Sequence, residues 1–121
     1  MYIFSFERLD VWHRSRLLVK EIYRVSAEFP KEEKFGLTSQ IRRAAVSVPT
    51  NLAEGSARKT PRDQSNFTTT SFSSLMEVLN LLIVATDLKM IEESKYLDSR
   101  PLIEEISNKL NALRNSQQGS M

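Results

Sequence analysis

Apolar residues recur at intervals of three and four positions through most of this chain, and that spacing constrains the fold more than any other feature. Ile103, Ile106, Leu110 and Leu113 show it plainly. Residues spaced in this way share one face of an α-helix, whereas a half-buried β-strand alternates every second position. Only 3 of the 121 residues are glycine and 4 are proline, which argues against a fold built from many turns. The chain is therefore predicted to be all-α.

Breaks in the apolar pattern divide the chain into four predicted helices, at about residues 9–29, 38–54, 62–89 and 94–114. Pro30 ends the first helix, and Thr38 or Ser39 is expected to cap the second. Gly55 is well placed as the left-handed residue that ends the second helix, and Thr60 as the cap of the third. Because short connections join antiparallel neighbours, we expect an up-down antiparallel four-helix bundle that forms one domain over residues 1–121.

The third predicted helix is apolar on nearly all sides between Leu75 and Leu88. A helix at the surface of a globular protein has one apolar stripe, so a helix of this kind is expected to be buried on more than one side. We infer that part of it contacts another subunit. No uninterrupted apolar run approaches the ~20 residues that a membrane span needs, so no membrane partner is expected.

The residue types exclude several kinds of chemistry. The chain has no cysteine and a single histidine, His13, so a disulfide framework, a cysteine nucleophile and a histidine-based metal site cannot be built within one subunit. No glycine-rich phosphate-binding loop is present. We expect no catalytic residue, metal, cofactor or small-molecule substrate, and hence no enzyme. The N-terminus does not resemble a signal peptide, which together with the lack of cysteine fits a cytoplasmic location.

Five hydrogen-bonding side chains follow one line along the second helix, at spacings of 3, 4, 4 and 3. This polar stripe consists of Gln40, Arg43, Ser47, Asn51 and Glu54. Two interpretations remain open: a solvated helix face, or a polar network that is buried or lies at a subunit interface. Glu54 lies in the last turn, where a carboxylate opposes the helix dipole by about 0.3–1 kcal/mol, so a cationic partner such as Arg43 or Arg58 is expected.

Basic side chains form a ridge on the first helix, opposite its apolar face, and further basic residues follow on the second helix and after it. The predicted nucleic-acid-binding residues are Arg16, Lys20, Arg24, Arg42, Arg58, Lys59 and Arg62. Contact between these side chains and phosphates would be salt-dependent and nearly independent of base sequence. The alternative is an ordinary solvated face, because the net charge is only +2.

The second helix and the residues before it carry a resemblance to a known family. The segments 29–33, 36–49 and 51–55, followed by Arg58, closely resemble the signature of the four-helix bundle proteins of the ribosomal RNA intervening-sequence type. Trp12, Phe67 and Glu77 also agree with that pattern, and the resemblance covers about residues 9–113. The run 66–70, Asn-Phe-Thr-Thr-Thr, is more polar than the aromatic-aliphatic run usual there.

The resemblance carries expectations about assembly and function. Such proteins are encoded within intervening sequences of large-subunit ribosomal RNA genes or elsewhere in bacterial genomes, and the resemblance implies a homopentameric ring. A distant relative, the accessory protein of diversity-generating retroelements, is a basic pentamer thought to bind nucleic acid and reverse transcriptase. We therefore expect a non-enzymatic, ring-forming protein that binds structured RNA or DNA through its basic surface. The alternative is a protein–protein adaptor or structural assembly with no nucleic-acid role.

Overall fold

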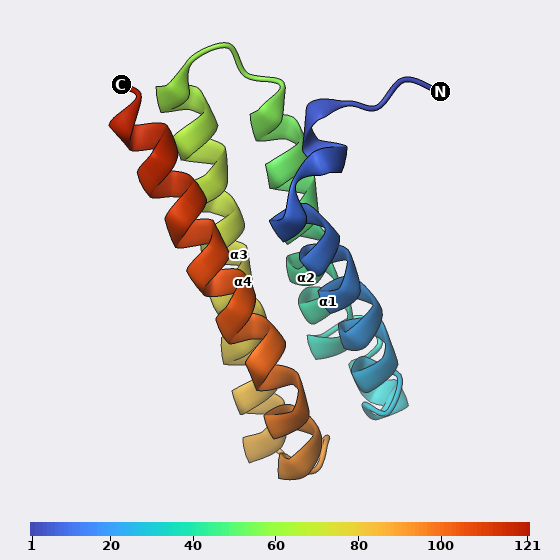
Figure 1. The fold of residues 1–121 in the computed structure, drawn as a ribbon. Helices are drawn as coiled ribbons and strands as arrows, with labels where there is room; N and C mark the ends of the chain where they lie inside the picture. Colours follow the sequence, from blue (N-terminus) through green and yellow to red (C-terminus); the bar gives the residue numbers. More distant parts are fainter.

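The computed structural model describes all 121 residues, and its elements are helices with no strand. The helices are α1 (Asp10–Ser26), α2 (Leu37–Ser56), α3 (Pro61–Asp87) and α4 (Glu93–Gly119), with 3₁₀ turns η1 (Ser5–Arg8) and η2 (Lys31–Glu33) before α1 and α2. Successive helices run in opposite directions (Figure 1). Each helix contacts the next, and α1 also contacts α4, which closes the bundle. The predicted all-α, up-down antiparallel four-helix bundle is confirmed.

A single apolar core of 19 buried residues runs between the four helices. Every helix contributes side chains with no solvent exposure, among them Leu18, Ile41, Leu82 and Ile106. Full burial of a side chain of this size stabilises the fold by about 1.5–3 kcal/mol relative to leaving it exposed. The apolar spacing that predicted the helices is therefore the spacing that builds the core.

The helix ends follow the sequence pattern only in part. At the start of α3, the Thr60 hydroxyl accepts a hydrogen bond from the Asp63 amide at 3.1 Å, as predicted. Neither Thr38 nor Ser39 caps α2, because that helix already begins at Leu37. The Leu37 amide donates instead to the Glu33 carboxylate, at 3.0 Å. The first helix ends at Ser26 rather than at residue 29.

Gly55 does not have the predicted left-handed conformation. It lies inside α2, and no glycine in the chain has a positive φ angle. A Cβ atom built on Gly55 would lie 2.6 Å from the Cβ atom of Phe67 on α3. Glycine is therefore needed at this position because α3 passes too close for any side chain.

The last helix is longer than predicted, since α4 continues through residues 115–119 rather than ending at about residue 114. Its end is tied to the polar start of α3. Thr68 donates to the Gln117 side chain at 2.8 Å, and Gln118 donates to Ser65 at 3.3 Å. The polar start of α3, which departs from the family pattern, therefore has a role in the fold. Thr68 from that run and the neighbouring Ser65 are buried against α4.

The contact between α1 and α4 is joined by charged side chains. Arg14 donates to Glu105 at 2.7 Å, while Lys109 bonds Asp10 and Lys95 bonds Glu28. The hydrogen bond from Lys109 lowers the pKa of the Asp10 carboxyl, chiefly because it stabilises the ionised form. Charged pairs therefore lie along the whole length of the seam between α1 and α4.

The apolar helix α3 is only partly enclosed by its own chain. By length and hydropathy alone it could also cross a membrane. Leu75, Val78 and Leu82 are nevertheless fully buried in the bundle, as in the core helix of a globular protein. Ile83 and Leu88 remain 37% and 57% exposed. The bundle therefore buries only part of the apolar surface of α3, and the rest is open for a partner to cover, as the predicted burial on more than one side requires.

Candidate nucleic-acid interface

Two of the seven predicted basic residues are held by their own chain. The Arg24 guanidinium donates to Glu21 at 2.6 Å, and this bond raises the pKa of Arg24. Arg42 donates to the Ser26 hydroxyl at 2.8 Å, and its guanidinium lies 4.5 Å from the ring centroid of Tyr23. The Arg24 side chain therefore links two turns of α1, and the Arg42 side chain links α2 to α1. The Tyr23 side chain beneath Arg42 is 43% exposed.

The other five predicted residues are exposed and form no ion pair. They are Arg16, Lys20, Arg58, Lys59 and Arg62. The Arg16 guanidinium lies 4.8 Å from the ring centroid of Trp12, and that of Arg58 lies 5.2 Å from the ring centroid of Phe67. Stacking of this kind orients a guanidinium group and leaves its N–H groups available for a phosphate.

Three of these cations belong to one end of the bundle, where α2 ends and α3 begins (Figure 1). Ser5 of η1 lines a cavity there with Gly55 of α2 and Gln117 of α4, so η1 packs against the same end. Arg8 of η1 is exposed and unpaired. We call this end, with Arg8, Arg58, Lys59 and Arg62, the basic end. Asp63, half-buried in the first turn of α3, offsets part of its charge.

The opposite end of the bundle carries exposed charges of both signs. Asp87, Glu92 and Glu93 lie at the turn from α3 to α4 and form no ion pair, and Lys31, Lys34 and Lys89 are exposed at the same end. An anionic partner is therefore attracted more strongly to the basic end than to the other.

Arg16 and Lys20 lie beside a groove of about 500 Å³ between α1 and α2. We call it the α1–α2 groove. It is lined by Phe6, Trp12, Arg16, Val19, Lys20, Val46, Pro49, Thr50, Ala53 and Glu54. Trp12 is half-buried, packs against the apolar core and forms part of this lining. Glu54 lies one helical turn before Arg58, so the groove and the basic end occupy the same half of the molecule.

The polar stripe of α2 is divided between network and surface. Ser47 shares a hydrogen bond with Ser74 of α3 at 2.8 Å, and Gln40 donates to Glu77 of α3 at 3.3 Å. Asn51 donates to Ser47 at 2.9 Å and so joins the network. The members left out, Arg43 and Glu54, are exposed without a hydrogen-bonding partner. The expected pairing of Glu54 with Arg43 or Arg58 is therefore absent.

Replacing Arg43 by alanine is expected to change the free energy of unfolding by less than about 0.5 kcal/mol, the usual range for an exposed side chain. Arg43 lines an open polar cavity of about 450 Å³ and loses no partner on substitution. Urea denaturation measures the change, with Ser71→Ala for comparison. Ser71 is buried and donates to the Val48 carbonyl at 2.8 Å, so its loss should cost about 1 kcal/mol. A cost above about 2 kcal/mol for Arg43→Ala would instead indicate burial in an assembly.

The ionisable groups form no other evident site. No group of three or more histidine, aspartate or glutamate side chains is arranged to hold a metal ion. The ring of His13 is hydrogen-bonded to the Glu7 carbonyl oxygen at 2.6 Å. The arrangement as a whole therefore offers cations, stacking surfaces and hydrogen bonds, which suit binding.

Comparison with known proteins identifies a matching family. The family described as "23S rRNA-intervening sequence protein" matches residues 7–112. This range includes all of α1, α2 and α3, the basic end and the α1–α2 groove except for Phe6. Among curated proteins, no significant match is found.

Proposed function

This chain belongs to the 23S rRNA-intervening sequence protein family, and from this premise we propose that it is a non-enzymatic protein that binds structured RNA, or another nucleic acid, through its basic half. The family description supports a role connected with ribosomal RNA. The observation that carries the proposal is that five predicted cations are exposed and form no ion pair with a carboxylate of their own chain.

Phosphate contacts are the part of nucleic-acid recognition that these residues supply. Arg58 and Lys59 lie on the turn before α3, and Arg62 lies in the first turn of that helix. Their side chains can therefore follow the curved phosphate backbone of a nucleic acid. Arg8, on η1, adds a cation that helical periodicity did not indicate. Release of condensed counterions by such side chains provides affinity without reading the bases.

The proposal predicts a steep dependence of affinity on salt. For a fluorescently labelled RNA hairpin, the logarithm of the association constant should fall linearly between about 50 mM and about 200 mM salt, with a slope near −4 for five phosphate contacts. Filter binding or fluorescence anisotropy measures this slope. Absence of binding at the lowest salt, or a flat response, would refute the proposal.

We further propose that the chain assembles into a ring, as the resemblance implies for a pentamer. The apolar surface that one chain leaves exposed supports this, since Phe35 is 90% exposed and Leu88 57% exposed. A ring would also repeat the basic end around one axis and multiply its attraction for a polyanion. Light scattering that shows only the 13.9 kDa chain at micromolar concentration would contradict the assembly.

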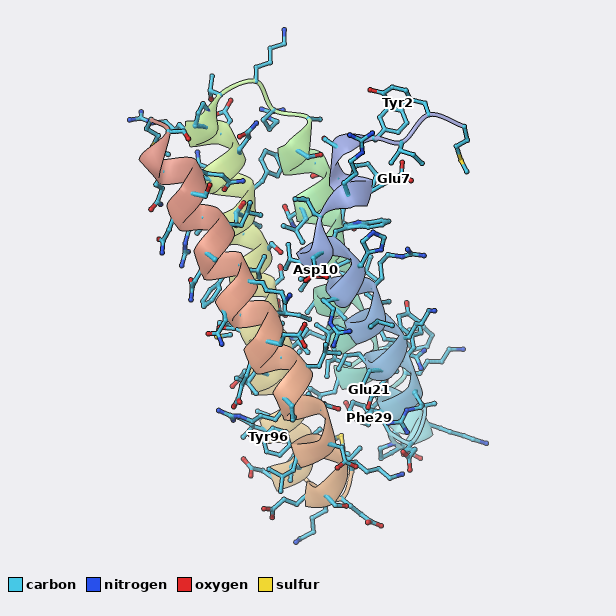
Figure 2. The ribbon with its side chains drawn as sticks, viewed as in Figure 1. Tyr2, Glu7, Asp10, Glu21, Phe29 and Tyr96 are labelled. Atoms are coloured by element: carbon cyan, nitrogen blue, oxygen red, sulfur yellow. The ribbon has the colours of Figure 1, made fainter.

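A protein–protein adaptor is the second candidate, and the N-terminal segment favours it. Met1, Tyr2 and Phe4 are exposed on a segment that runs out from the bundle, where Tyr2 stands clear of the helices (Figure 2). An adaptor predicts that freshly purified protein carries no nucleic acid. The proposed function predicts bound nucleic acid that is visible by ultraviolet absorbance and can be sequenced.

A further inference from the structure

We propose that the α1–α2 groove binds an unpaired nucleotide, with the base inside the groove and its phosphate against Arg16 and Lys20. The inference rests on the proposed function and narrows its substrate to strands with unpaired bases, such as loops, bulges and single-stranded ends. The groove combines a mostly apolar lining, including Trp12, with two cations that form no ion pair, Arg16 and Lys20.

The lining of the groove suits a flat aromatic ligand. Trp12 and Val19 of α1 face Val46, Pro49 and Ala53 of α2 across it. Val46 is 40% exposed and so presents apolar surface in the groove. Unstacked bases bind proteins by lying against aromatic and apolar side chains and arginine planes, and this groove offers all three.

The charged side chains at the groove suit both the phosphate and the base of a nucleotide. Arg16 and Lys20 are one turn apart on α1, and neither forms an ion pair. They can hold a phosphate through charge-assisted hydrogen bonds. Glu54 of α2 is the one carboxylate in the lining, and it is unpaired. A carboxylate accepts hydrogen bonds from base amino groups, so cytosine, guanine and adenine should be preferred to uracil.

The position of Glu54 also discriminates between nucleotides and acidic peptides. A peptide rich in carboxylates would satisfy Arg16 and Lys20 but would be repelled by Glu54. A bound nucleic-acid strand would instead keep its phosphates outside the groove, against Arg16 and Lys20, and place the amino groups of its bases inside the groove. Because Glu54 is one helical turn from Arg58, a strand held at the basic end can continue directly to the groove.

The experiment uses Trp12, the only tryptophan in the chain, as a reporter inside the groove. An unstructured RNA oligonucleotide and the fully paired duplex of the same sequence are titrated at low salt, and occupancy is followed separately by anisotropy of a label. At equal occupancy, the single strand should quench Trp12 fluorescence and the duplex should not.

A groove-filling variant tests the same point without changing charge. Ala53→Leu should weaken single-strand binding by about tenfold, in line with the loss of one base-stacking contact, and leave duplex binding unchanged. Ala112→Leu, at an exposed position on α4, is the matched control and should change neither. Circular dichroism verifies that both variants are folded.

The outcomes separate this inference from the proposed function. Salt-dependent binding with equal affinity for both RNAs and no selective quenching would overturn the groove as a nucleotide site and leave the proposed function intact. If neither the single strand nor the duplex binds, both the inference and the proposed function are overturned. Quenching of Trp12 by an oligoglutamate peptide as strong as that by RNA would show that the groove is a peptide site and that the inference is wrong.

Discussion

Alanine in place of Gly55 is expected to lower the free energy of unfolding by about 1–3 kcal/mol, although alanine is normally the better helix former. The added Cβ atom would lie 2.6 Å from the Phe67 Cβ atom and 3.6 Å from the Gln64 carbonyl oxygen. Neither atom belongs to the far end of a flexible side chain, so α2 and α3 must move apart. Urea denaturation followed by circular dichroism measures the loss.

Two comparisons identify the cause of that loss. Gly119→Ala places a Cβ atom with nothing within 4 Å and should be neutral or stabilising by up to about 1 kcal/mol. Phe67→Gly removes the atom that Gly55→Ala would meet, so in that background the Gly55 substitution should no longer destabilise. An unchanged cost in the double variant would show that close helix approach is not the reason for the glycine.

Serine at both Arg58 and Lys59 is expected to weaken binding of a structured RNA by about 10- to 100-fold at low salt, and to make the salt slope shallower by about 2. Both side chains are exposed at the basic end and take part in no ion pair. Their removal therefore takes away phosphate contacts without breaking a contact between charged groups of the fold. Filter binding across a salt series measures both quantities.

Lys31→Ser with Lys34→Ser is the matched control for this variant. It removes the same charge from exposed positions before α2, at the other end of the bundle (Figure 1). Its affinity at about 0.1 M salt should stay within about twofold of the unchanged protein, since exposed charges separated by more than about 10 Å are largely screened there. Equal losses in the two variants would show that net charge, rather than the basic end, determines binding.

The helical periodicity of the sequence was sufficient to predict the fold because it reports directly on burial. Ile41, Leu82 and Ile106 are fully buried at the positions that spacing indicated. The meaning of Gly55 was missed because a close approach depends on which helix passes by, and α3 follows only after a turn. The extension of α4 was missed for the same reason, since Gln117 is fixed by a partner far away in the sequence, Thr68.

The candidate interface could be predicted from the sequence only where its contacts are local. The pairing of Arg24 with Glu21 is local, three residues apart on one helix, and follows from helical geometry. The bond from Arg42 to Ser26 depends on how α1 and α2 pack. Arg8 lay outside the four predicted helices, and only the contact of η1 with α2 brings it to the basic end.

The charged seam between α1 and α4 makes part of the stability of the fold depend on pH. Because the pKa of Asp10 is lowered in the folded chain, the stability that its bond with Lys109 supplies is present at neutral pH and is lost as the pH falls through the lowered value. Leu18 of α1 and Ile106 of α4 are fully buried in the apolar core, which carries no titratable group. The bond between Lys109 and Asp10 lies at the surface, where an ion pair adds little to stability. Acid should therefore loosen the charged seam while α1 and α4 stay joined through their buried side chains.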